Sequence, residues 1–298
     1  MVTRRDLLKT AAIAAPLAAS GIGWSLDAAA SMQYGYAAIT WGKDYMAAID
    51  EIAAVGFAGI QLRTGDGLLD RFGGKPEALR ELLARKRLAF PAFSSGNLSI
   101  DPAREREMID LHVEHARFLH AAGGLYLQVI DERPKGRPVV ADDYRRLGQL
   151  LTTLSRRVRD AGVTLVYHHH MNSTGEPPAA IEAIVAASDP ASVGLLFDIA
   201  HYQQGGGDPV AGIHKFAKRI RAVHLKDVRP IDTAPGYQWV ELGRGRVDVK
   251  GCVAALRAAN YDGWAIVELD KVVDPDGSPK ASAIANREYV VKQLGLTL

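Results

Sequence analysis

The chain has 298 residues, of which 48% are hydrophobic and 23% are charged, so it can form one large globular domain or two small ones with ample core. Its 36 basic and 34 acidic residues are interspersed and give a formal net charge of +2, which excludes the strong field expected of a protein that binds nucleic acid or an anionic membrane. We therefore expect a small, soluble partner.

The first thirty residues have the pattern of an export signal. Arg4 and Arg5 precede a short apolar stretch, AAIAAPLAAS, and the small-residue segment LDAAAS follows it. This order is typical of a twin-arginine (Tat) signal peptide, with cleavage near Ala30 and a periplasmic or secreted mature protein. The apolar stretch is too short to span a bilayer comfortably, which disfavours the alternative of an uncleaved anchor. Proteins exported by the Tat route fold before export, often with a cofactor bound. A bound metal ion would be consistent with this route.

Apolar, strand-like runs alternate with amphipathic helical stretches from residue 31 to residue 298, and no linker divides them. The eight predicted strands span residues 34–40, 59–63, 88–94, 125–130, 163–169, 193–198, 221–227 and 264–269. The clearest predicted helices span residues 103–122 and 142–161. Eight apolar strands alternating with helices predict a single (βα)8 TIM barrel over residues 31–298. A doubly wound open sheet would alternate similarly, but no glycine-rich phosphate loop follows the first strand.

Polar residues interrupt the last four apolar runs at the same relative depth, near their ends. In chain order they are His168, His169 and His170, then Asp198 and His201, then His224, Lys226 and Asp227, and finally Glu268 and Asp270. The C-terminal strand ends of a TIM barrel form one face and hold its chemistry, so we expect these side chains to converge.

A metal ion is the expected reason for this convergence. Asp198 and Glu268, with two neutral imidazoles, could neutralise a divalent ion with mixed nitrogen and oxygen ligands. A single strand-end aspartate is more often a helix cap, and a single histidine more often a core residue, but four such ends in succession favour ligation by Asp198, His224 and Glu268. Because side chains alternate along a strand, His168 and His170 should share the inward face, as a ligand or as substrate-binding groups, while His169 faces out.

The segments LLFDIAHYQQGGGDP, RIRAVHLKDV and WAIVEL resemble the xylose isomerase-like TIM-barrel superfamily of sugar phosphate isomerases and epimerases, over essentially the whole mature chain. The segments LVYHHHM, FDIAH and AVHLKDV are more specifically similar to its inosose dehydratase branch. The resemblance implies that one divalent ion (Mn²⁺, Co²⁺, Mg²⁺ or Zn²⁺) is bound by the matching positions His168, Asp198, His224 and Glu268. His168 departs from the family pattern, which has a glutamate there.

The departure at His168 has a chemical consequence. Family epimerases and isomerases use two opposed glutamates as acid and base, and His168 breaks that symmetry. Glu268 as a single carboxylate base, with His168 as an acid of near-neutral pKa, better suits removal of an α-proton and protonation of a departing β-oxygen. We therefore expect β-elimination from a keto-sugar or keto-cyclitol, with isomerisation or epimerisation as the alternative.

Supporting roles follow from position and resemblance. His201 would hydrogen-bond a substrate hydroxyl or else orient His224, and Lys226 would balance enolate charge or else pair with Asp227. Further substrate-binding residues are predicted to be His170, Trp41, Gln61, and Arg244 or its neighbour Arg246.

The predicted function is thus a metal-dependent dehydratase or lyase. The alternatives are a sugar isomerase or epimerase, a periplasmic sugar-binding barrel without turnover, and an abasic-site endonuclease of the same fold. The last would need more metal ligands and a basic face for DNA, which the balanced charge and the export signal disfavour. The substrate is expected to be a small sugar or cyclitol. The protein itself is expected not to insert stably into a membrane after cleavage of the signal peptide, and it could form a homo-oligomer.

Overall fold

The computed structural model describes residues 32–295. The predicted signal peptide, including Arg4 and Arg5, lies outside these residues. Within the described part of the chain, no helix is long and apolar enough to cross a membrane.

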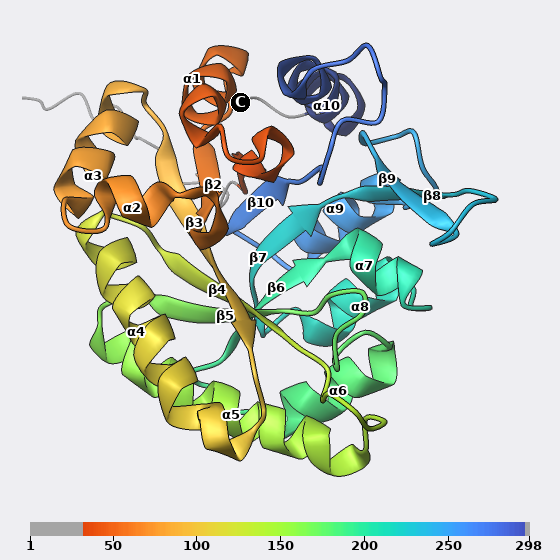
Figure 1. The fold of residues 1–298 in the computed structure, drawn as a ribbon. Helices are drawn as coiled ribbons and strands as arrows, with labels where there is room; N and C mark the ends of the chain where they lie inside the picture. Colours follow the sequence, from red (N-terminus) through yellow and green to blue (C-terminus); the bar gives the residue numbers. More distant parts are fainter. Residues whose placement is uncertain (1–31, 296–298) are drawn as a thin grey trace, which may run out of the picture.

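Eight parallel strands close into a barrel in the order β1-β10-β7-β6-β5-β4-β3-β2, which confirms the predicted TIM barrel (Figure 1). The barrel strands are β1 (Gln33–Ala37), β2 (Gly59–Arg63), β3 (Ala89–Leu98), β4 (Tyr126–Asp131), β5 (Thr164–His168), β6 (Gly194–Asp198), β7 (Ile220–Leu225) and β10 (Trp264–Val267). Each of the eight predicted strands corresponds to one of them.

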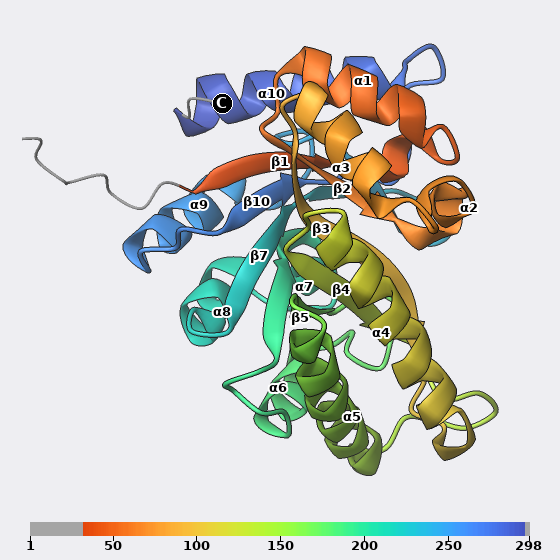
Figure 2. The same ribbon diagram turned by 90° about the vertical axis from the view of Figure 1, so that its left-hand side faces the viewer.

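Helices surround the barrel on its outside, as two perpendicular views show (Figures 1 and 2). The α-helices are α1 (Tyr45–Val55), α2 (Leu68–Phe72), α3 (Pro76–Arg85), α4 (Glu105–Ala121), α5 (Ala141–Asp160), α6 (Pro178–Ala186), α7 (Ile199–Gln204), α8 (Pro209–Phe216), α9 (Val249–Ala258) and α10 (Pro279–Leu294). Short 3-10 turns are η1 (Ala38–Trp41), η2 (Thr64–Asp66) and η3 (Pro102–Arg104). The amphipathic pattern of α5 is typical of the set, because Leu147, Leu151 and Leu154 are buried at helical spacing.

The inside of the barrel changes from apolar to polar along each strand. Val166, Leu196 and Ala222 pack together in the interior of the barrel, and Ile266 lies in a neighbouring cluster with Trp264. The residue two positions further along each of these four strands shares the same face. Those residues are His168, Asp198, His224 and Glu268. The strand pleat therefore places all four predicted ligands next to the apolar interior residues of the barrel.

A two-stranded antiparallel hairpin, β8 (Asp227–Pro230) and β9 (Tyr237–Val240), lies outside the barrel sheet (Figure 1). The sequence predicted one strand through residue 227, and this was wrong, because the barrel strand ends at Leu225. The predicted first strand is also too long, since residues 38–41 form η1. At the start of this hairpin, Asp227 turns its carboxylate toward backbone N–H groups of the segment that follows β9, as described below.

Candidate metal centre

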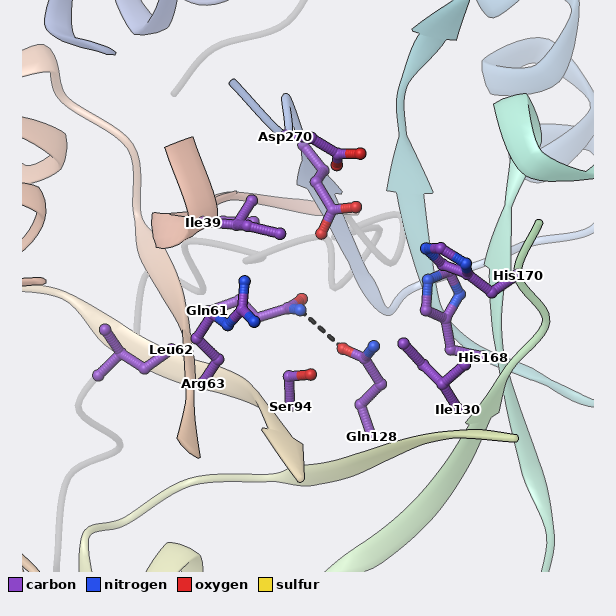
Figure 3. A pocket seen from close by; sticks show the side chains of 12 residues that line it. Ile39, Gln61, Leu62, Arg63, Ser94, Gln128, Ile130, His168, His170 and Asp270 are labelled. Atoms are coloured by element: carbon purple, nitrogen blue, oxygen red, sulfur yellow. Dashed lines mark hydrogen bonds between the residues drawn. The ribbon is translucent and has the colours of Figure 1, made fainter. Parts of the chain in front are cut away.

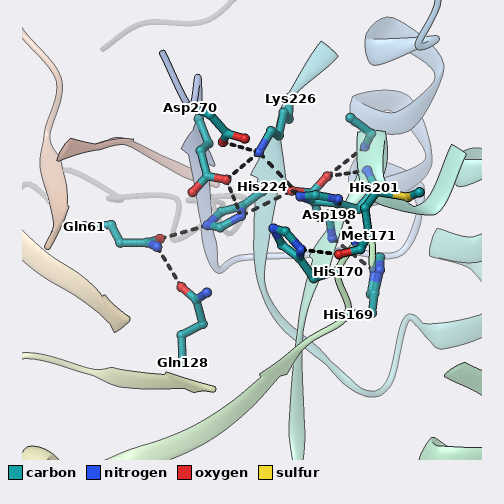
Figure 4. Close-up of polar contacts among 12 residues, drawn as sticks. Gln61, Gln128, His169, His170, Met171, Asp198, His201, His224, Lys226 and Asp270 are labelled. Atoms are coloured by element: carbon teal, nitrogen blue, oxygen red, sulfur yellow. Dashed lines mark hydrogen bonds and ion pairs between the residues drawn. The ribbon is translucent and has the colours of Figure 1, made fainter. Parts of the chain in front are cut away.

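Four barrel strands bring their polar ends together at the C-terminal mouth of the barrel (Figure 4). Asp198 on β6 is directly opposite His224 on β7 in the strand register. His168, Asp198, His201 and Glu268 each offer one ligand atom, and these atoms lie within 4.8 Å of one another. All four residues are buried.

Asp198 uses its two carboxylate oxygens differently. Oδ1 accepts the backbone N–H groups of Ala200 and His201 at 2.9 and 2.8 Å, which caps the start of α7. Oδ2 is buried and has no hydrogen-bond partner among the described residues. Burial opposes ionisation, but the neighbouring His224 and Lys226 outweigh it and lower the pKa of Asp198. The helix cap and the candidate ligand are therefore two atoms of one ionised side chain.

His224 is oriented by a neutral amide. Its Nε2 lies 2.9 Å from the carbonyl oxygen of Gln61, and because a carbonyl can only accept, this nitrogen must carry the proton. The opposite nitrogen, Nδ1, lies 3.4 Å from Asp198 Oδ2 and 3.6 Å from Glu268 Oε1, and has no hydrogen-bond partner. In the neutral ring this atom holds a lone pair facing two carboxylate oxygens, an arrangement that a cation would stabilise.

Lys226 is fully buried and pairs with two carboxylates. Its Nζ lies 2.9 Å from Glu268 Oε1 and 2.5 Å from Asp270 Oδ1, and it sits 4.6 Å from the ring centre of Trp239 on β9. Desolvation would lower the pKa of Lys226, but Asp270 and Glu268 raise it well above its usual value. The pKa of Glu268 is lowered, because His224 and Lys226 outweigh the effect of burial. The ammonium group and the Glu268 carboxylate are therefore both ionised at neutral pH.

The three consecutive histidines divide as the strand alternation predicted. His168 and His170 line the cavity at the barrel mouth, whereas His169 lies on the outer side of β5, against Phe197 and Tyr202. Burial, followed by the neighbouring His224, lowers the pKa of His168 well below 6.5. The expectation that His168 is an acid of near-neutral pKa is therefore wrong, and a neutral imidazole suits a ligand instead.

His201 has the opposite tautomer from the one that a ligand would need at this position. Its Nδ1 accepts the backbone N–H of Met171 at 3.1 Å, so the proton of the neutral ring is on Nε2. Burial, with Lys226, lowers the pKa of His201 well below 6.5. Proximity groups His201 with the ligand atoms, and its Nε2 also lies 3.4 Å from Lys226 Nζ. The Met171 contact places the proton on this Nε2, and Lys226 directs its own protons to Glu268 and Asp270. We therefore assign the fourth ligand position to His224, and His201 to a donor role toward substrate.

His170 has its proton on the other nitrogen. Its Nδ1 lies 2.7 Å from the carbonyl oxygen of Met171 and must donate to it, which leaves a lone pair on Nε2. The ring is half-buried and stacks on His201, with ring centres 3.9 Å apart. His170 therefore offers an acceptor at the cavity wall.

The cavity at the barrel mouth has a volume of about 170 Å³. Its mixed polar and apolar lining suits a small hydroxylated molecule such as a monosaccharide or cyclitol. Figure 3 shows His168 and His170 on one side of the cavity, and Ile39, Gln61 and Arg63 on the other. The remaining lining residues are Ala37, Leu62, Ser94, Gln128, Ile130, Glu268 and Asp270.

Sequence reasoning found some of these residues and missed others. Gln61 lines the cavity as predicted, but Gln128, Ser94 and Arg63 were missed. Gln128 had a visible signal, since it is the one polar residue in the apolar run 125–130. Trp239 was also missed, because its hairpin was not predicted.

Three predicted substrate-binding residues, Trp41, His201 and Arg244, are not among those that line this cavity. Trp41 donates its indole N–H to Glu51 at 2.7 Å and packs edge-on against Tyr36. Arg244 pairs with Glu241 at 3.2 Å, and its side chain is 60% exposed. Their roles toward substrate stay predictions, as does that of Arg246, which hydrogen-bonds Gln204.

Asp227 is not the partner of Lys226, contrary to one of the two sequence interpretations. Its carboxylate accepts the backbone N–H groups of Val228, Gly243, Gly245 and Val247 at 2.8 to 3.0 Å. A Cβ on Gly245 would lie 2.2 Å from Asp227 Oδ1, so only glycine allows this close approach. Asp227 thus fastens the segment after β9 beside the barrel mouth.

The donor set fits a divalent cation. His168 Nδ1, Asp198 Oδ2 and His224 Nδ1 are buried and lack hydrogen-bond partners within residues 32–295, although buried polar atoms are normally paired. They come from the ends of three neighbouring strands, and Glu268 closes the group from β10. Two imidazole nitrogens and two carboxylates are a common donor set for a divalent metal ion.

Comparison with known proteins agrees with the fold. A model of the family described as xylose isomerase-like TIM barrel matches residues 49–290. Inosose dehydratase of Lacticaseibacillus casei is 27% identical over 300 residues, which covers 87% of this chain and 96% of the relative.

Two solved structures share the fold. The IolI protein, whose crystal structure has a bound zinc atom, superimposes with a TM-score of 0.76 at 18% identity, over 89% of this chain and 98% of IolI. L-ribulose 3-epimerase superimposes with a TM-score of 0.73 at 17% identity, over 89% of this chain and 95% of that protein.

Proposed function

Since this chain belongs to the xylose isomerase-like TIM barrel family and is a lyase or an isomerase, we propose that it is a divalent-metal-dependent dehydratase. Its substrate would be a keto-sugar or keto-cyclitol. The reaction would pass the proton next to the carbonyl to a carboxylate and then expel the β-hydroxyl group as water, with the departing oxygen taking a proton back from that carboxylic acid. The dehydratase name of the sequence relative and the small polar cavity support this assignment.

The ion would be held by His168, Asp198, His224 and Glu268. Equal numbers of nitrogen and oxygen donors favour a borderline ion such as Zn²⁺ or Co²⁺ over Mg²⁺, which prefers oxygen ligands. When bound, the ion would act as a Lewis acid toward the substrate carbonyl and stabilise the negative charge that forms on it.

Glu268 would accept the α-proton. Its carboxylate is ionised, lines the cavity and is held in place by Lys226. The Lys226 ammonium reduces the repulsion between this carboxylate and an enolate formed beside it, and its Asp270 contact prevents it from moving away. His201 would donate its Nε2–H to a substrate oxygen, an assignment supported by the tautomer that Met171 imposes.

Elimination is favoured by the one-sided distribution of carboxylates in the cavity. Both lining carboxylates, Glu268 and Asp270, contact the same lysine, and no lining residue of the other strands within the described chain is a carboxylate. Epimerisation needs a second base on the opposite face of the enolate. One observation favours it as the second candidate, because the Nε2 lone pair of His170 on the side of β5 could serve as that base.

Reaction in D2O separates the two outcomes. After reconstitution with Zn²⁺ or Co²⁺, the wild type should convert a keto-cyclitol or keto-sugar into an unsaturated product, with little deuterium in recovered substrate by NMR. His168→Glu should increase deuterium exchange or epimerisation, whereas the same substitution at the exposed His214 on α8 should change neither. Rapid exchange in the wild type without unsaturated product would refute the dehydratase and support the epimerase.

We also propose that the protein is exported by the Tat route to the periplasm or beyond. The arginine pair and the short apolar stretch in the sequence support this proposal.

A further inference from the structure

Two buried amides bridge the mouth of the barrel. The side-chain nitrogen of Gln61 on β2 donates to the carbonyl oxygen of Gln128 on β4 at 2.7 Å, and the carbonyl oxygen of Gln61 faces His224 on β7 (Figure 4). Gln61 is 4% exposed and Gln128 is 2% exposed. In the barrel order these three strands are not neighbours, so the chain of hydrogen bonds crosses the interior.

In the structure both amides point the same way along this chain. With its nitrogen donating to Gln128, Gln61 can present only its oxygen to His224, and that oxygen can only accept. A flipped Gln61 would place its oxygen against the Gln128 oxygen, where neither atom can donate. While the Gln128 oxygen faces Gln61, Gln61 keeps its own oxygen toward His224, and the His224 proton stays on Nε2.

The tautomer of His224 decides what its inward nitrogen can do. With the proton on Nε2, the Nδ1 lone pair faces Asp198 Oδ2 and Glu268 Oε1 and can bind a cation. With the proton on Nδ1, the ring would donate to one of these carboxylates and could not act as a ligand there. Because both amides are uncharged, they select the ligating tautomer without changing the charge of the site.

We propose that Gln61 and Gln128 are positioning residues that preset His224 as a metal ligand, an inference that rests on the proposed metal site. Gln61 thereby acts on the ion through His224, in addition to lining the cavity. Groups that orient a metal-binding histidine typically contribute 10- to 100-fold to metal affinity, so Gln61→Met should weaken Zn²⁺ binding by about that factor. Gln61→Glu keeps an acceptor for Nε2–H and, once the Gln128 amide rotates to donate to the new carboxylate, should retain affinity within a few-fold. Gln128→Met frees Gln61 to rotate and should cause a smaller loss.

The test measures Zn²⁺ affinity by competition with a chromophoric chelator, together with ring ¹H–¹⁵N spectra of His224 in zinc-loaded, histidine-labelled protein. Gln149→Met, the same change at an exposed position of α5, is the matched control and should bind Zn²⁺ like the wild type. We expect a protected Nε2–H signal in the wild type and its loss or broadening in Gln61→Met. If Gln61→Met acted only by changing the packing, it would not remove the His224 Nε2–H signal selectively, and Gln61→Glu would not restore that signal.

The outcomes separate this inference from the proposed metal site. Wild-type protein that binds neither Zn²⁺ nor Co²⁺ would refute the metal site. Wild-type binding with equal affinity in Gln61→Met, or a His224 proton on Nδ1 in the zinc-loaded protein, would overturn the role of the amides alone. If Gln61→Met does not fold, Gln128→Met provides the same comparison.

Discussion

Replacing Lys226 by methionine should destabilise the metal-free protein strongly. Lys226 is fully buried, and its ammonium is the positive charge held between Glu268 at 2.9 Å and Asp270 at 2.5 Å. Removing one partner of a buried ion pair leaves an uncompensated charge and typically costs about 3 to 5 kcal/mol. For a domain of this size each kcal/mol lowers the melting temperature by roughly 2 to 4 °C, so we expect a fall of roughly 6 to 20 °C.

Thermal and urea unfolding of metal-free Lys226→Met, read by circular dichroism, measures this effect. Lys292→Met is the matched control, because Lys292 pairs with Glu288 at 2.9 Å on an exposed helix face and should change stability by less than about 1 kcal/mol. Without Lys226 the pKa of Glu268 should rise, so the loss should be smaller at pH 5 than at pH 8. A Lys226→Met protein that melts within 2 °C of the wild type would refute the buried ion-pair network.

Three further predictions concern the metal, acid stability and export. Chelation of the loaded protein should abolish activity and lower the melting temperature, because Asp198 and Glu268 lose the cation between them; unchanged activity after verified metal removal would contradict the metal-dependent mechanism. Burial lowers the pKa of His112 to about 4. Between pH 6.5 and 4 the unfolded chain therefore binds a proton at His112 and the folded protein does not. The free energy of unfolding should be full above pH 6.5 and fall by roughly 3 kcal/mol as the pH drops toward 4. His112→Gln should flatten the dependence of unfolding free energy on pH between 6.5 and 4, and an unaltered slope would show that His112 is not its source. Replacing Arg4 and Arg5 together by lysine should retain the precursor in the cytoplasm, and normal export of that double variant in a fractionation experiment would exclude a Tat signal.

The barrel and its polar mouth could be predicted because they follow from local patterns. Eight apolar runs of strand length alternate with helices, and parallel strands bring all their C-terminal ends to one face. The period of two along each strand then places His168, Asp198, His224 and Glu268 on the inner face, two residues beyond apolar interior positions. The inward positions need only the local period of two, whereas the barrel needs the alternation of strands and helices along the chain.

The features that were missed depend on contacts between distant segments. β7 ends before Asp227, whose carboxylate accepts backbone N–H groups 16 to 20 residues away in the segment 243–247. The pKa of His168 is set by its burial among other strands. The tautomers of His201 and His224 depend on Met171 and Gln61, which no spacing in the sequence places beside them.

The charges at the barrel mouth explain why a divalent ion matches this site better than a monovalent one. Around the candidate metal position, with the ring nitrogens neutral as ligation requires, Asp198, Glu268 and Asp270 carry three negative charges and Lys226 carries one positive charge, while the Arg63 guanidinium belongs to the opposite wall of the cavity. The remaining two negative charges are buried, and burying them unpaired would be costly. A divalent ion balances them, and a neutral site lets an enolate form without facing a net negative charge. Because the ion binds the folded barrel and not the unfolded chain, metal binding also stabilises the fold, which is the state that the proposed Tat route would carry across the membrane.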